Sequence, residues 1–117
     1  MDRNIFKSRS VGMHLTAGAE NIVYTCPNNY TSHIELLFAA NLGSGNKTLT
    51  IKWYDATTDT DYYIIGGHVI SSYNFLKLDG SYLTLNAGDH ISFTPEAGST
   101  MDATLTVEEY YDPTSNQ

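Results

Sequence analysis

Apolar and polar side chains alternate along most of this chain, and no stretch shows the spacing of a helix. Two runs, 33–41 and 48–54, have the two-residue period of a strand with one buried face. Between them, 43–46 holds glycine, serine and asparagine, which favour turns. The sequence therefore predicts one long β-hairpin over 33–55, whose apolar face lies in the core. The predicted core residues of this hairpin are Ile34, Leu36, Phe38, Leu49, Ile51 and Trp53.

Shorter apolar runs follow the same pattern on both sides of this stretch, and Gly-, Pro- and Asn-rich segments separate them. About eight short strands without a helix favour an all-β fold. We predict a single antiparallel β-sandwich or jelly-roll-like domain. Besides the two arms of the hairpin, the predicted strands are 11–16, 20–26, 61–65, 68–70, 82–85, 90–94 and 102–111.

The length of 117 residues allows one domain with a real core, but not two. We place the β-sandwich at 12–111. Residues 1–11 are polar and basic with little apolar periodicity, so they are expected to form an N-terminal arm, and 112–117 is expected to form a polar C-terminal tail. Arg3, Lys7 and Arg9 in this arm are half of the six Lys and Arg residues.

The overall balance of charge is acidic, with a formal net charge of −7. This argues against a nucleic-acid partner, which selects a basic surface. Cys26 is the only cysteine, so an internal disulfide is excluded. No apolar run has the length of a signal peptide or of a membrane span. We therefore expect a protein made in the cytoplasm that contacts neither nucleic acid nor membrane.

Candidate metal ligands are scattered. Three aspartates in 55–61 could offer oxygens to calcium, but the spacing lacks the glycine and the distal glutamate of an EF-hand loop, so a solvated hairpin loop is the simpler interpretation. The histidines fall on different predicted strands without a short ligand spacing, which argues against a zinc or iron site. They are His14, His33, His68 and His90.

Motifs for catalysis are missing from the sequence. There is no GxSxG, no Cys/His pairing and no phosphate loop. Glu108 and Glu109 are neighbours on one predicted strand, so they point to opposite faces and cannot act as an acid and base pair unaided. The sequence thus predicts no catalytic residue, no metal, no cofactor and no enzymatic activity.

Nine tyrosines, beside four Phe and one Trp, are more large rings than so small a sandwich can bury. Surplus amphipathic aromatics suit a subunit interface or a sugar-stacking platform. The basic arm can dock on an acidic neighbouring subunit, although a solubilising terminus is an equally ordinary role. The predicted interface residues are Arg3, Lys7, Arg9, Tyr62, Tyr63, Tyr110 and Tyr111.

Four short motifs occur in a familiar order: YTxP at 24–27, AN at 40–41 before a Gly/Ser turn, TLTI at 48–51 and LNAGDHI at 85–91. Together they resemble small β-sandwich virion proteins of tailed bacteriophages, which serve as head decorations or as neck and tail components. The resemblance covers about 20–110, and it carries no functional residue over to this chain. The LxxGDxI hairpin also occurs in tumour-necrosis-factor-like jelly rolls. What the resemblance implies is a symmetric oligomer that adds contacts to a shell or tail.

These features lead to one main hypothesis and two alternatives. The chain is expected to be a structural, non-enzymatic virion protein, made in the host cytoplasm. Its expected role is that of a capsid decoration or cement protein that forms a homo-oligomer, for instance a trimer, and contacts the major capsid protein. A neck or tail accessory protein is the first alternative. A carbohydrate-binding, receptor-recognition module is the second, and it would need coplanar exposed aromatics.

Overall fold

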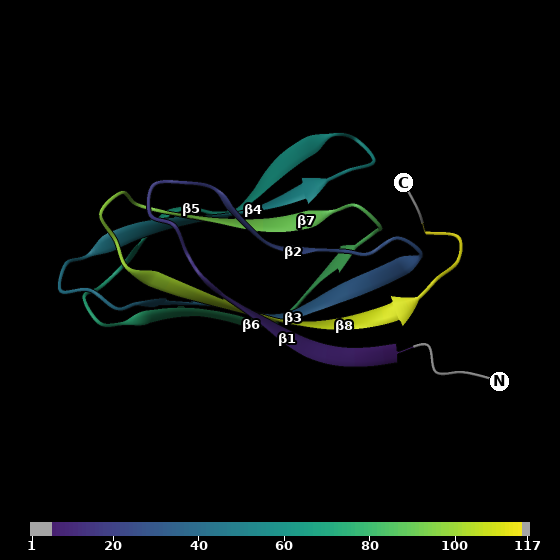
Figure 1. Cartoon of the computed structure of the whole chain (residues 1–117), viewed down its shortest axis with the longest axis horizontal. Coiled ribbons are helices and arrows are strands. Elements are labelled where there is room, and N and C mark those ends of the chain that lie inside the picture. The colour runs from purple at the N-terminus through teal and green to yellow at the C-terminus, as the bar shows by residue number, and fades with distance from the viewer. Residues whose placement is uncertain (1–5, 116–117) are drawn as a thin grey trace.

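The computed structural model describes residues 6–115, and the side chains of these except at 6 and 80–82. Short strands joined by Gly-, Asn- and Pro-containing turns make up this part of the chain, as the alternating pattern predicts. No helix within it is long and apolar enough to cross a membrane. The eight described strands, shown in Figure 1, are β1 (Phe6–His14), β2 (Asn21–Thr25), β3 (Tyr30–Asn41), β4 (Lys47–Asp55), β5 (Thr60–Ile70), β6 (Phe75–Leu85), β7 (His90–Pro95) and β8 (Met101–Tyr111).

Two four-stranded antiparallel sheets face each other. One has the strand order β1-β8-β3-β6, and the other has the order β2-β7-β4-β5. Within the described chain, β4 and β5 are the only consecutive strands that pair, and every other connection crosses between the sheets. This is the topology of a jelly roll, so the predicted all-β antiparallel sandwich is confirmed.

The predicted hairpin over 33–55 is wrong. β3 and β4 belong to opposite sheets, and the segment 42–46 carries the chain from one to the other. Asn41 holds this crossing, because its Nδ2 donates to the carbonyls of Gly45 at 2.9 Å and of Ile70 at 3.0 Å. Alternation identifies a buried face but not a pairing partner, and here the two apolar faces pack against each other across the core instead of lying side by side.

Two of the predicted core residues lie elsewhere. Ile34, Leu49 and Ile51 are buried, and Trp53 is partly buried against the core. A β-bulge shifts the register of β3 between Ile34 and Leu36. Because an extra residue exchanges the two faces of a strand, the inward series continues at Leu37, Ala39 and Asn41 instead. Leu36 and Phe38 are therefore not part of the buried core, and Phe38 stacks on the exposed Phe75 at 5.3 Å.

Part of the predicted N-terminal arm is a strand instead. Residues 6–11 belong to β1, which pairs with β8 along its full length, from Phe6 opposite Tyr110 to His14 opposite Asp102. The rest of the predicted arm, 1–5, lies outside the described residues, as do 116 and 117. At the other end, 112–115 folds back, since the amide of Asp112 donates to the carbonyl of Asn29 at 2.7 Å.

Candidate assembly surface

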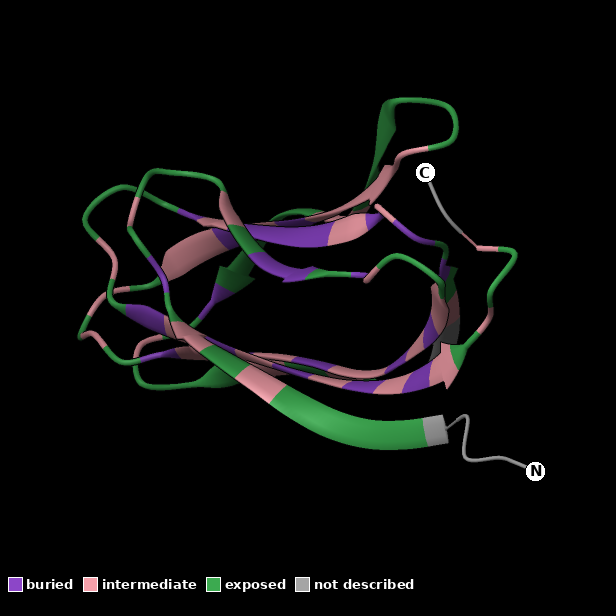
Figure 2. Cartoon of the chain, turned by 45° about the vertical axis from the view of Figure 1, so that its right-hand side comes forward, coloured by how far each residue is buried: buried purple, intermediate pink, exposed green. Residues whose placement is uncertain are grey.

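The sandwich has two long sides, each bounded by one edge strand from each sheet. β1 and β2 form one side, and β5 and β6 form the other. The β5/β6 side is rich in exposed aromatic and aliphatic groups, and Figure 2 shows the exposed outer part of the β4–β5 hairpin. Among the described residues, six of the eight exposed large hydrophobic side chains lie on or next to it: Leu42, Tyr62, Tyr63, Val69, Tyr73 and Phe75.

Tyr62 and Tyr63 lie on β5 near the hairpin tip. Tyr62 stacks on Trp53 with 5.2 Å between ring centroids, so part of its ring extends the core to the surface. Tyr63 points the other way and is 70% exposed, with Lys52 Nζ at 5.8 Å from its ring centroid. An edge strand with apolar groups on both faces is a surface that another chain can cover.

The second part of this side is the connection from β5 to β6. Tyr73 is 73% exposed and has a positive φ of 58°, a conformation that bulky residues rarely adopt. Its amide donates to the carbonyl of Gly43 at 3.1 Å, which fixes this turn against the β3–β4 crossing. Next to it, the stacked rings of Phe38 and Phe75 lie on the outer face of the β1-β8-β3-β6 sheet.

Between β5 and β6 the sandwich is not fully filled. A cavity of about 320 Å³ opens there, lined by Ile64 of β5, by Leu78 and Leu83 of β6, and by 34–37 of β3. Glu35, at the bulge, points one carboxylate oxygen into buried surroundings, where it has no hydrogen-bond partner among the described residues. The β5/β6 side is thus both exposed and loosely packed.

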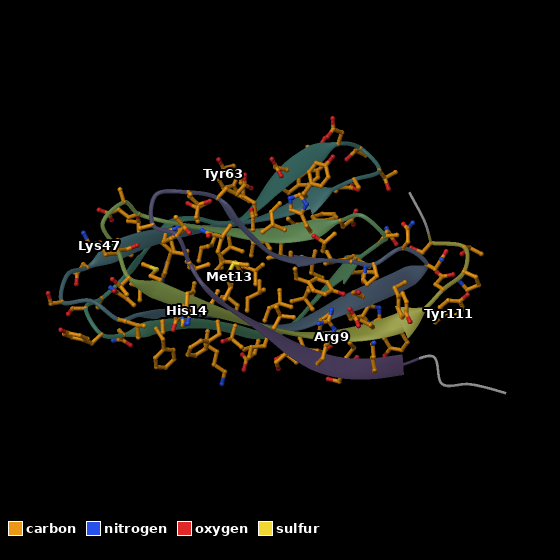
Figure 3. The ribbon with its side chains drawn as sticks, viewed as in Figure 1. Arg9, Met13, His14, Lys47, Tyr63 and Tyr111 are labelled. Carbon is orange, nitrogen blue, oxygen red and sulfur yellow. The ribbon has the colours of Figure 1, made fainter. Side chains whose placement is uncertain are left out.

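The other predicted tyrosines lie apart from this surface. Tyr111 ends β8 and packs edge-on against Tyr30, with 5.7 Å between centroids. Tyr110 is partly buried, lies 5.0 Å from the His33 ring and donates its hydroxyl to Glu108 at 3.2 Å. Figure 3 shows Tyr111 at the end of β8 and Tyr63 on the opposite sheet. The structure therefore does not join the two tyrosine pairs into one surface.

The basic residues of the predicted arm are engaged within the chain. Glu109 lies on the inner face of β8 and is only 1% exposed. Arg9 Nε and Nη2 donate to its two oxygens at 3.1 Å each, and Lys7 Nζ lies 3.9 Å from Oε1. The Tyr24 hydroxyl from the opposite sheet donates to Oε2 at 2.5 Å and lies 2.7 Å from Ser32 Oγ. Arg3 lies outside the described residues.

This network shifts the pKa of Glu109, Arg9 and Tyr24. Burial raises the pKa of Glu109, but the hydrogen bonds from Arg9 and Tyr24 outweigh burial and leave the pKa below its ordinary value. The same contacts raise the pKa of Arg9, and burial together with Glu109 raises that of the Tyr24 hydroxyl. Burial also raises the pKa of the nearby Cys26 thiol. Glu109 is therefore a fixed anion that ties β1 to β8 and β2.

Sequence reasoning did not find a second cluster on the outer face of the other sheet. Glu20, Asp61 and His90 come from three separate segments, yet each places one possible metal ligand within 4.8 Å of the others. Lys52 Nζ lies among them, at 3.6 Å from Glu20 and 3.8 Å from Asp61. The ammonium group already supplies the positive charge that these carboxylates attract. No spacing in the sequence links positions so far apart.

The predicted aspartate loop is a turn in this structure. Asp55 accepts the amide of Thr57 at 3.0 Å, and Asp59 accepts the Tyr54 hydroxyl at 2.5 Å. Asp61 points to Lys52 instead, so the three carboxylates do not converge on one point. The fully buried carboxylate of this region is Asp89, which accepts the amide of Ala56 at 2.9 Å and joins the β6–β7 turn to the β4–β5 hairpin.

The sequence matches no known protein family and no curated protein. Solved structures do share its fold. A chain in the acidic stable capsid of Helicobacter pylori bacteriophage KHP30 aligns with a TM-score of 0.56 at 8% identity, over 95% of this chain and 90% of that one. A chain of infectious bursal disease virus, Gx strain, aligns with a TM-score of 0.58 at 8% identity, over 98% of this chain but only 35% of that one. Eiger TNF from S. frugiperda aligns with a TM-score of 0.50 at 11% identity, over 97% and 100%. At these identities the likeness shows a common fold and nothing more.

Proposed function

We propose that this chain is a structural, non-enzymatic protein of a virus particle, and specifically a decoration or cement protein of a tailed-phage capsid that contacts the major capsid protein. The observation that carries the proposal is the β5/β6 side, where two open strand edges lie beside exposed rings such as Tyr63 and Tyr73. The jelly-roll fold, which this chain shares with a chain of a phage capsid, supports it.

In this proposal, many weak contacts between this protein and the shell add up to stabilise the particle. Tyrosine rings bury large apolar areas with little loss of side-chain entropy, and open strand edges offer main-chain hydrogen bonds. One such contact is weak, but symmetry repeats it many times over a shell, so the sum resists disassembly. In this proposal, Tyr62 and Tyr63 are contact residues. Arg9 acts within the domain, because the Nε and Nη2 edge of its guanidinium is used on Glu109.

Purified particles provide the direct test. We expect mass spectrometry of particles from infected cells to detect this chain in stoichiometric amounts in separated heads. Its presence only in separated tails would favour the neck or tail alternative. Its absence from both fractions would refute a virion role.

Binding to shells tests the surface itself. Purified protein is added to particles that lack it, and the bound fraction is measured by co-sedimentation. We expect Tyr63→Ser combined with Tyr73→Ser to lower binding strongly. Ile22→Ser is a matched control, because Ile22 is an exposed apolar residue on β2 at the opposite side. Equal losses in both variants would contradict a contact through β5 and β6.

Self-association belongs to the same proposal. Light scattering of the purified protein should give the mass of a homo-oligomer, and Tyr63→Ser should shift the protein toward the monomer. The carbohydrate-binding alternative predicts a different result: glycan-array binding that depends on Tyr62 or Tyr63, together with no place in the particle. The exposed ring of Tyr63 beside Lys52 is the observation that keeps this alternative open.

A further inference from the structure

At one end of the sandwich the β3–β4 and β7–β8 loops enclose a polar cavity. Its volume is about 370 Å³, and its lining includes the backbone of Gly43, Gly45 and Gly98 and the side chains of Ser44 and Lys47. The two loops are joined, since the amide of Leu42 donates to the carbonyl of Thr100 at 2.8 Å. Figure 3 shows Lys47 at this end, opposite to Tyr111.

The ammonium group of Lys47 differs from the other described cations. Lys7, Arg9, Lys52 and Lys77 each lie within ion-pair distance of a carboxylate, as the 3.4 Å contact from Lys77 to Asp79 illustrates. Within 6–115, Lys47 has no such partner. On a chain of net charge −7, a cation that remains unpaired beside a cavity is available to an external anion.

Two glycines flank this lysine. A Cβ atom at Gly98 would lie 3.9 Å from Lys47 Nζ, and one at Gly45 would lie 3.7 Å from Lys47 Cε. Gly98 also has a φ of +79°, which disfavours any side chain there. The lysine stem thus passes between two side-chain-free stretches of backbone, and its charge stays at the cavity.

Hydrogen-bond donors are available around it. In the described chain, the amides of Ser44 and Gly45 donate to no protein acceptor, and neither does the Ser44 hydroxyl. Glu96, two positions before Gly98 in the β7–β8 loop, is directed to Thr48, because its Oε1 accepts the amide of Thr48 at 2.9 Å and the Thr48 hydroxyl at 3.3 Å. Exposed amides of a glycine-rich loop beside a lysine are the chemistry that binds oxyanions.

We infer that this cavity binds an oxyanion with at least two acceptor oxygens, either a phosphate group or a carboxylate. Lys47 supplies the charge, and the amides of Ser44 and Gly45 orient the oxygens. This site adjoins the β5/β6 side, since the amide of Tyr73 donates to the carbonyl of Gly43, but the inference does not depend on the virion role.

Titration with inorganic phosphate at constant ionic strength, followed by amide NMR, tests the inference. We expect saturable shifts at 43–45 and 98–100 in the millimolar range, and a loss of affinity of about tenfold or more in Lys47→Met. Lys77→Met is the matched control, because this lysine lies on β6 and is paired with Asp79; its affinity for phosphate should be unchanged.

A second titration, with acetate, distinguishes a phosphate ligand from a carboxylate ligand. Tighter binding of phosphate than of acetate assigns the site to a phosphate group, and equal or tighter binding of acetate assigns it to a carboxylate. Absence of saturable shifts with both anions would overturn the inference. So would unchanged affinity in Lys47→Met, provided that its amide spectrum outside the two loops matches that of the parent protein.

Discussion

The two sides of the sandwich handle their edge strands in opposite ways. On the β1/β2 side, the buried Glu109 joins the edge strand β1 to β8 through Arg9 and reaches the opposite sheet through Tyr24. On the β5/β6 side, a cavity and exposed rings take the place of such a tie. Open edges invite pairing with other chains and charged side chains on an edge discourage it, so the apolar β5/β6 side is the one through which we propose association. In the proposed role, the β1/β2 side contributes stability and the β5/β6 side contributes association.

The largest expected effect on stability comes from removing the Glu109 carboxylate on the β1/β2 side. In Glu109→Ala, Arg9 and the Tyr24 hydroxyl lose their acceptor in a buried site, and we expect the free energy of unfolding to fall by about 3 kcal/mol. Urea unfolding measures it. Glu108→Ala is the neighbouring control on the outer face of β8, with an expected loss below about 1 kcal/mol. Equal losses for the two variants would contradict the role of Glu109.

The bulge in β3 gives two adjacent leucines near the β5/β6 side different degrees of burial. Leu37 is 5% exposed in the core, whereas Leu36 is only partly buried at the cavity. We expect Leu37→Ala to lower the free energy of unfolding by roughly 2–3 kcal/mol and Leu36→Ala by about 1 kcal/mol or less. Thermal or urea unfolding of both variants measures the difference. A larger loss in Leu36→Ala would show that the strand keeps the uninterrupted alternation.

Acid should lower the stability that Glu109 contributes on the β1/β2 side. The pKa of Glu109 is lowered in the folded protein, so its contribution to stability is fully present above the pKa of an unfolded glutamate and is lost as the pH falls through the folded value. We expect the free energy of unfolding to decrease as the pH falls below the ordinary pKa of a glutamate. Glu109→Gln removes this titration, so its curve should be flatter than that of the parent protein. Parallel curves would exclude Glu109 as the source.

The smallest expected effect on stability comes from replacing Tyr63 on the β5/β6 side. Tyr63 is exposed, with the ammonium of Lys52 over its ring, so Tyr63→Ser should change the free energy of unfolding by no more than about 0.5 kcal/mol. Self-association should decrease in the same variant. Urea unfolding and light scattering on one preparation measure both. A loss of stability comparable to that of Glu109→Ala would remove the distinction between the two sides.

Part of the candidate surface was predictable from the sequence. Tyr62 and Tyr63 stand out because a run of large residues on both faces of a strand indicates an edge or an interface, and the structure places them on an edge strand. Tyr73 was not predicted as a contact residue, because its exposure depends on a turn with positive φ. The contact role of these tyrosines stays a prediction.

Local pattern by itself determined that this protein is an antiparallel β-sandwich and placed β2, β3, β4, β7 and β8 to within about three residues, because period-two alternation and turn residues act over a few positions. It displaced β1, shortened β6 and divided β5 at Gly66 and Gly67. Only the tertiary structure decided which strands pair, which face follows the bulge at Glu35, and that Glu109 is a buried anion beside Arg9. Those outcomes depend on contacts between segments up to 100 positions apart. Such contacts are chosen by the packing of the whole core, and no local spacing records them.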